Sequence, residues 1–170
     1  MKPMTRGLVV ALIHVGLVAS LGAKFLWERA TLPRVWVRTA PYDPQLPLRG
    51  RYLSLQVLID DKDVHFPVSN ERWAVAGQGW PVTLSVQSDR LVATVVSERS
   101  SVSVDFHSGN TYGLDQRVAF FIPEHIADPS RRPAGEQLWM ESTIPKEGPP
   151  RPIRLGVRRG DGPIVPLRIE

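Results

Sequence analysis

The 170-residue sequence contains no cysteine, and it has no strong excess of charge of either sign. Without cysteine the chain can form no disulfide, no thiolate zinc site and no cysteine nucleophile. Its 21 Lys and Arg residues exceed its 17 Asp and Glu residues by four. Three of these four charges, on Lys2, Arg6 and Lys24, lie in residues 1–27, which hold no acidic residue. The remainder is nearly neutral and lacks the positive face that nucleic-acid binding needs, so no nucleic-acid partner is expected.

Recognisable catalytic and cofactor motifs are also missing. The sequence has no glycine-rich phosphate loop, no nucleophile elbow and no complete calcium loop. Asp63 and His65 stand two residues apart and could place two metal ligands on one strand face. Asp105 and His107 form a second such pair. Because each pair supplies only two ligands, we predict no metal site and no cofactor. Enzymatic activity is left open, with a non-catalytic role favoured.

One long apolar segment, Leu8–Leu26, is present near the N-terminus. As a helix its 19 residues would span roughly 28 Å, close to the thickness of the hydrocarbon core of a bilayer. Lys24 lies near its end, where a long side chain can reach the membrane interface. The small excess of positive charge before the segment, on Lys2 and Arg6, predicts a cytoplasmic N-terminus. We therefore expect Leu8–Leu26 to contact the lipid bilayer and the rest of the chain to lie outside the cytoplasm.

A retained anchor is favoured over two alternatives for this segment. Ser20–Gly22 resembles the small-x-small site of a cleaved signal peptide, but the apolar run exceeds the usual h-region of about 7–15 residues. A buried core helix would have a polar face, which this segment lacks. A stripe of small residues, including Gly16 and Ala23, is typical of close helix contacts and equally of membrane segments in general. The expected organisation is a cytoplasmic N-terminus over 1–7, an anchor over 8–27, a tether over 28–34 and an extracytoplasmic domain over 35–170.

After residue 34 the apolar pattern changes to a period of two. In Tyr52–Ile59, for example, Leu, Leu, Val and Ile at odd positions alternate with more polar residues, which is typical of a half-buried strand. The other expected strands are Val35–Val37, Val64–Pro67, Trp73–Ala76, Val82–Gln87, Leu91–Val96, Val102–Phe106, Val118–Ile122, Leu138–Ile144, Pro152–Val157 and Ile164–Ile169. So many short strands predict a mostly β fold, an antiparallel β-sandwich or barrel-like domain behind one N-terminal transmembrane helix.

Two stretches of the domain are more specific than strand formation requires. The first runs over residues 37–55 and the second over residues 112–124. Their distinctive positions are Asp43, Pro44, Arg49, Gly50, Tyr52 and Leu55 in the first stretch, and Tyr112, Gly113, Phe121, Pro123 and Glu124 in the second. Together they resemble the bacterial membrane-anchored family named for its GDYXXLXY motif. Arg51 stands where that motif has its acidic residue, and Val57 stands where it has its final tyrosine.

The resemblance implies a single-pass protein of the bacterial cytoplasmic (inner) membrane, with a periplasmic domain of unassigned activity. Because such proteins are typically found with polytopic membrane proteins, it also implies an accessory or interaction module for a partner of that kind. The alternative is a membrane-tethered envelope enzyme or small-ligand-binding domain, with its site near Arg49 and Tyr52 and near Tyr112 and Glu124. A packing role does not explain the charges of Arg49 and Glu124, and we hypothesise that they form a pair or share a partner site.

Overall fold

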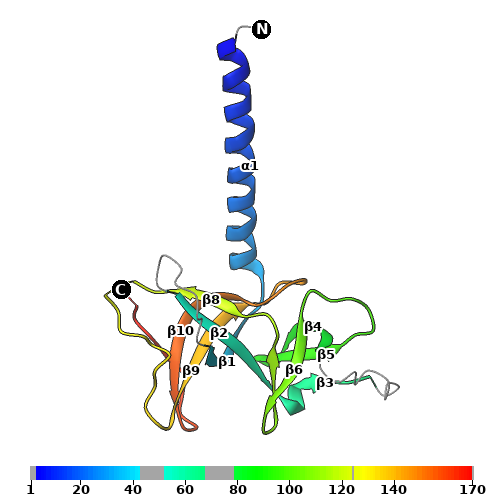
Figure 1. The fold of residues 1–170 in the computed structure, drawn as a ribbon, viewed down its shortest axis with the longest axis vertical. Helices are drawn as coiled ribbons and strands as arrows, with labels where there is room; N and C mark the ends of the chain where they lie inside the picture. Colours follow the sequence, from blue (N-terminus) through cyan, green and yellow to red (C-terminus); the bar gives the residue numbers. More distant parts are fainter. Residues whose placement is uncertain (1–2, 43–51, 68–78, 124, 170) are drawn as a thin grey trace. The chain divides into compact units, whose positions relative to one another are not determined.

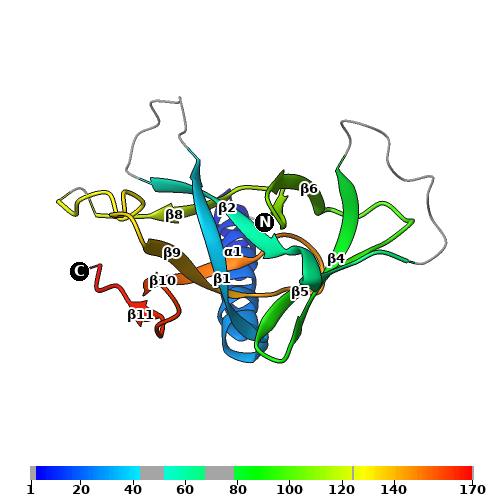
Figure 2. The same cartoon turned by 90° about the horizontal axis from the view of Figure 1, so that it is seen from below.

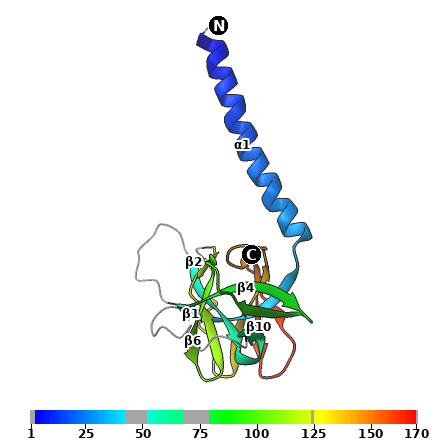
Figure 3. The same cartoon turned by 90° about the vertical axis from the view of Figure 1, so that its right-hand side faces the viewer.

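The computed structural model describes residues 3–42, 52–67, 79–123 and 125–169. The chain divides into two compact units, one ending at Leu32 and the other beginning at Pro33. The first unit is a single helix, α1 (Pro3–Thr31), which runs without interruption for 29 residues (Figures 1 and 3). It continues through residues 28–31 of the expected tether and ends before Pro33, because proline disfavours the helical conformation of the residue that precedes it.

Most of α1 is long and apolar enough to cross a membrane. The candidate span is Arg6–Thr31, and no residue of its most apolar window is buried. Its polar side chains bond to the helix itself: the Ser20 hydroxyl donates to the Leu17 carbonyl at 2.8 Å, and His14 Nδ1 lies 2.8 Å from the Val10 carbonyl oxygen. Such local bonds lower the cost of placing a polar group in lipid. Length and composition fit a membrane anchor and equally a signal sequence.

The second unit is mostly β, which confirms the predicted fold class. Its elements are β1 (Arg34–Tyr42), β2 (Tyr52–Asp60), the 3-10 turn η1 (Asp61–Asp63), β3 (Val64–His65), β4 (Trp80–Gln87), β5 (Arg90–Val95), β6 (Ser103–Ser108), β7 (Thr111–Leu114), β8 (Val118–Phe121), β9 (Glu136–Thr143), β10 (Arg151–Arg159) and β11 (Val165–Pro166). The expected strand Trp73–Ala76 lies outside the described residues. The alternation missed β7, whose four residues are too few to show a period, and Ile164–Ile169 contributes only the two residues of β11.

The eleven strands of the described residues form one sheet. Ten follow the order β11-β10-β9-β1-β2-β7-β6-β4-β5-β3, and β8 pairs with β2 outside this order. On its side away from β1, β2 has two partners: residues 52–55 pair with β8, and residues 58–60 pair with β7. Every pairing is antiparallel, as predicted, except the short parallel pair of β3 and β5. Because β5 returns close to β1 and β2, the sheet folds over and encloses a core (Figure 2).

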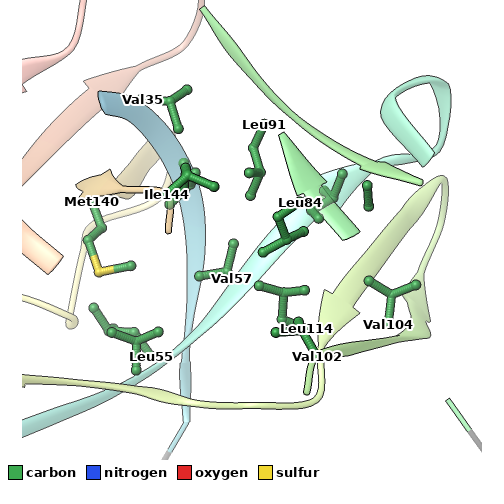
Figure 4. Close-up of a cluster of buried hydrophobic side chains, with 14 of the residues drawn as sticks. Val35, Leu55, Val57, Leu84, Leu91, Val102, Val104, Leu114, Met140 and Ile144 are labelled. Carbon is green, nitrogen blue, oxygen red and sulfur yellow. The ribbon is translucent and has the colours of Figure 1, made fainter. Parts of the chain in front are cut away.

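β2 thus joins two lobes of the β domain (Figure 1). The first lobe contains β1, β8, β9, β10 and β11, and the second contains β3, β4, β5, β6 and β7. One core runs through both lobes, and Val57 lies between Met140 on one side and Leu84 and Leu114 on the other (Figure 4). Val57, Leu114 and Met140 are fully buried, and each such side chain contributes about 1.5–3 kcal/mol to stability.

Candidate functional site

The structure brings parts of the two motif stretches together on β2. Tyr52 lies opposite Phe121 of β8, and the centroids of their rings are 6.3 Å apart. Farther along the same strand, Leu58 lies opposite Gly113 of β7. Stretches that are separated by more than fifty residues in the sequence are therefore neighbours in the sheet.

Three of the motif residues have structural roles. Leu55 is completely buried in the core. A Cβ at Gly113 would overlap the side-chain amide of Gln56, which donates a hydrogen bond to the Leu114 carbonyl at 3.2 Å. Pro123 accepts a bond from the backbone N–H of Ile126 at 3.2 Å and so ends β8 in a turn. Packing and turn geometry account for these positions without a ligand.

Five of the candidate residues cannot be placed in the site. These are Asp43, Pro44, Arg49, Gly50 and Glu124, which lie outside the described residues. The hypothesised pairing of Arg49 with Glu124 lies outside them as well, and it stays a prediction.

Tyr52 and Phe121 belong to an exposed surface at the edge of the sheet. Phe121 is 75% exposed, although phenylalanine is usually buried. Nearby on β1, the exposed ring of Tyr42 carries the guanidinium of Arg117 at 3.4 Å from its centroid. We call this group the β8 surface; it consists of Tyr42, Tyr52, Arg117 and Phe121. Their residue types are those enriched in protein interfaces.

Tyr112 lies in a separate aromatic cluster of the second lobe. Its ring contacts those of Phe66, Trp80 and Phe106, with centroids 5.9 to 6.0 Å apart. Burial raises the pKa of the Tyr112 hydroxyl, and the charge of Asp61 and a hydrogen bond to its carboxylate raise this pKa further. Phe66 and Phe106 are 45% and 62% exposed, so the cluster also reaches the surface.

Tyr52 and Tyr112 do not converge on one site. Tyr112 pairs with Ile59, which is seven positions from Tyr52 on β2, a separation of roughly 23 Å along a strand. Neither tyrosine lines the two clefts described below. The alternative ligand site also includes Arg49 and Glu124, which lie outside the described residues, and it stays a prediction.

A large cleft lies instead on the outer face of β1, and the sequence analysis missed it. It has a volume of about 1070 Å³ and opens to solvent. Its walls are the end of β2 with η1, the turn between β4 and β5, and the turn between β10 and β11. The one signal in the sequence is the alternation of Arg34, Trp36 and Arg38, which places all three side chains on one face of the strand.

Two tryptophans, Trp36 of β1 and Trp139 of β9, form the floor of this cleft. They lie outward because they alternate with residues of the buried core. Gly156 of β10 leaves space for the first ring: a Cβ there would lie 2.8 Å from Cζ3 of Trp36 and 2.8 Å from Cγ2 of Ile164. Because residue 156 has no side chain, the indole of Trp36 can pack closely against β10.

Each indole carries an arginine. The guanidinium carbon of Arg154 is 5.5 Å from the centroid of Trp36, and that of Arg158 is 5.5 Å from the centroid of Trp139. Both distances fit cation–π attraction. Arg154 Nε also donates to a carboxylate oxygen of Glu141 at 2.5 Å, and Glu141 is only 8% exposed. Arg154 and Arg158 therefore lie over the two rings, and Arg154 also neutralises the nearly buried Glu141.

An ion-pair chain crosses the other side of the cleft and connects the two lobes. Arg38 of β1 lies 3.1 Å from the carboxylate of Asp60 at the end of β2. Arg90 of β5 lies 4.0 Å from the same carboxylate and 2.6 Å from that of Asp63 in η1. Because these groups are partly exposed, each pair contributes about 1 kcal/mol or less.

The charges that line the cleft are balanced. Five lining residues are basic: Arg34, Arg38, Lys62, Arg90 and Arg158. Five are acidic: Asp60, Asp63, Asp89, Glu136 and Asp161. The cleft therefore has no net formal charge, and it is suited neither to a polyanion nor to a bare cation.

The two Asp–His pairs that the sequence analysis weighed, without predicting a metal site from them, form no larger cluster among the described residues. Asp63 belongs to η1 and is paired with Arg90, so it does not share a strand face with His65. Asp105 and His107 are exposed on β6. Across the described ranges, no group of three or more His, Asp or Glu residues could hold a metal ion.

Comparison with known proteins finds no matching family model, no matching curated protein and no matching solved structure. The likeness to the GDYXXLXY family therefore depends on the quoted motif residues alone. What the chain does must be inferred from its own geometry.

Proposed function

We propose that this chain is a single-pass, membrane-anchored interaction module of a bacterial cytoplasmic membrane. Its β domain lies outside the cytoplasm and serves as an accessory domain of a polytopic membrane protein. The observation that carries this proposal is α1, whose candidate span Arg6–Thr31 is joined to β1 through only Leu32 and Pro33. With a retained helix, so short a connection keeps the β domain at the membrane surface, since two extended residues span roughly 7 Å.

The surfaces of the β domain support binding to a protein. Large hydrophobic side chains that stay in water mark interaction sites when they gather in patches. Phe121 at the β8 surface and Phe106 in the second lobe are both more than half exposed. The aromatic and arginine residues around them are the types that contribute most to binding energy in protein interfaces.

Topology is tested with the full chain in bacterial membranes. A reporter that works only outside the cytoplasm is fused after Glu170, and the mass of the mature protein shows whether the N-terminal segment is retained. We expect an active reporter and a chain that keeps Leu8–Leu26. Neutral residues at Lys2 and Arg6 should give mixed topology, because they remove the charge bias, whereas the matched variant Arg38→Gln should not.

Two results would contradict the proposal. A reporter that is active only in the cytoplasm would place the domain on the wrong side of the membrane. A mature chain that begins near Lys24 would show that the segment is a cleaved signal peptide.

A further inference from the structure

The geometry of the cleft on the outer face of β1 leads us to propose that it binds an extended polypeptide segment from an extracytoplasmic loop of the partner membrane protein. This inference rests on the proposed function and names the place where the partner binds. The cleft differs from the motif positions that the sequence singled out, since neither Tyr52 nor Tyr112 lines it.

The size of the cleft suits a chain segment. Small-molecule sites occupy roughly 300–1,000 Å³ and bury most of their ligand. The cleft of about 1070 Å³ is at the upper limit of that range and is open to solvent. An open groove of this volume can hold several residues of an extended chain that enters and leaves at its ends.

The balance of charge favours a polypeptide. With five basic and five acidic lining residues, the cleft presents both signs along its walls. Arg38, Arg90, Asp60 and Asp63 pair with one another, and Glu136 pairs with Arg159. The exposed lining residues Lys62, Asp89 and Asp161 still present charge of both signs to a ligand. A polypeptide with both basic and acidic side chains can complement both walls.

The floor argues against a stacked sugar ring. An aromatic platform for stacking needs an open ring face, but Arg158, which lines the cleft, lies over Trp139. Its Nε donates to the Gly162 carbonyl at 3.0 Å, and its terminal nitrogens are further hydrogen-bond donors for a ligand. Tryptophan and arginine are the residues most enriched at the centres of protein interfaces.

Both long walls are held by tight turns, so the groove is formed before the ligand binds. Ser88 and Asp89 have φ of 48° and 57° and make a compact turn between β4 and β5. Opposite them, Gly160 has φ of 51°, and its N–H donates to the Gly135 carbonyl at 3.2 Å. A preformed groove loses less conformational entropy on binding.

The test uses a photocrosslinking residue introduced into the full chain in its native membrane. It replaces Lys62 or Asp161, which are exposed on different walls of the cleft. Matched controls replace Glu147, which lines a separate cleft of about 880 Å³, and Phe106 in the second lobe. We expect adducts from the two cleft positions only, with mass spectrometry mapping both to one extracytoplasmic loop of a polytopic protein.

A second measurement reverses charge without disturbing the core. In Lys62→Glu/Asp161→Lys the two substituted side chains are exposed, so the melting temperature should stay unchanged. Co-purification with the crosslinked partner should fall about tenfold, because two walls of the cleft then carry the wrong sign. The control Glu147→Lys should leave co-purification unchanged.

The outcomes separate the cleft from the broader proposal. Adducts with a membrane protein that arise only from Phe106 or Glu147 would overturn the cleft and leave the interaction role intact. A cleft adduct that resists proteases and is removed by glycosidases would overturn the polypeptide ligand. If no position gives an adduct and the reporter fused after Glu170 is active only in the cytoplasm, both proposals are overturned.

Discussion

Two groups of aromatic side chains on the β domain are built in opposite ways. In the cleft, Trp36 lies over Gly156 and under the guanidinium of Arg154, so a missing side chain below and a charged layer above enclose it. In the second lobe, Phe106 and Tyr112 contact each other edge to face at 6.0 Å, and Phe106 stays 62% exposed. The first group is covered by charged side chains, whereas part of the second, above all Phe106, is exposed to solvent.

The comparison shows that exposure alone does not identify a binding surface. The tryptophans of the cleft are only partly exposed, yet they line the larger groove. The second group is more exposed, and its rings do not line either of the two clefts described above. A ligand that needs a fixed shape should therefore prefer the cleft.

The largest effect is expected from Gly156→Ala. The new Cβ would lie 2.8 Å from the ring of Trp36 and 2.8 Å from Cγ2 of Ile164, so two side chains would have to shift. We expect a loss of about 1–3 kcal/mol in the free energy of unfolding, measured by denaturant titration of the full chain in detergent. Gly113→Ala is the matched strand control: only the flexible end of Gln56 must move, so it should cost about 1 kcal/mol. Equal losses at both sites would contradict a tightly packed floor.

The next largest effect is expected from Arg154→Ala. This change leaves the carboxylate of Glu141, which is 8% exposed, without its partner and removes the cation over Trp36. The free energy of unfolding should fall by about 1–2 kcal/mol, since Arg154 itself is half exposed and water replaces part of the lost interaction. Adding Glu141→Gln should restore part of the loss. If the double variant is less stable than the single one, neutralisation of Glu141 is not the role of Arg154.

A smaller effect is expected from Phe106→Ala. Because this ring is mostly exposed and makes one edge contact with Tyr112, its removal should cost only about 0.5 kcal/mol. Thermal melting of the full chain, carried out on Phe106→Ala and on Arg154→Ala, compares the two losses of stability. A loss as large as that of Arg154→Ala would mean that the two aromatic groups are equally important to the fold.

The smallest effect concerns pH. Burial and the nearby Asp61 raise the pKa of Tyr112 above 10.0, so the folded chain holds this proton more tightly than the unfolded chain does. The resulting stabilisation is fully present below pH 10.0 and is lost as the pH rises through the folded-state pKa. Asp61→Asn should lower the pKa of Tyr112 toward 10.0, seen as tyrosinate absorbance at lower pH, without reaching it because burial remains. An unchanged titration would contradict the contact with Asp61.

The sequence predicted much of the fold because local patterns decide it. The alternation in β2 placed Leu53, Leu55, Val57 and Ile59 on the buried face, and all four lie in the core. The apolar run predicted one N-terminal helix, which continues four residues beyond the predicted end of the anchor, to Thr31. The sequence missed β7 and predicted β11 to be longer than it is, since two to four residues carry no measurable period.

The candidate site was predicted less well. The sequence singled out the motif positions Leu55 and Gly113 as distinctive, and their roles in the structure are packing and close approach. The cleft was missed because its residues come from β1, β9 and β10 and from two turns, and no sequence spacing connects them.

By itself, the sequence determined the membrane-compatible helix and the β character of the domain, because hydrophobic periodicity acts over neighbouring residues. Only the tertiary structure decided that β2 pairs with β8 along one half and with β7 along the other, and that the sheet folds back to leave a groove beside β1. The physical reason is that strand partners and groove walls are selected by the burial of a shared core between distant segments. Only when that core has formed does Gly156 lie against Trp36 and Arg154 pair with Glu141.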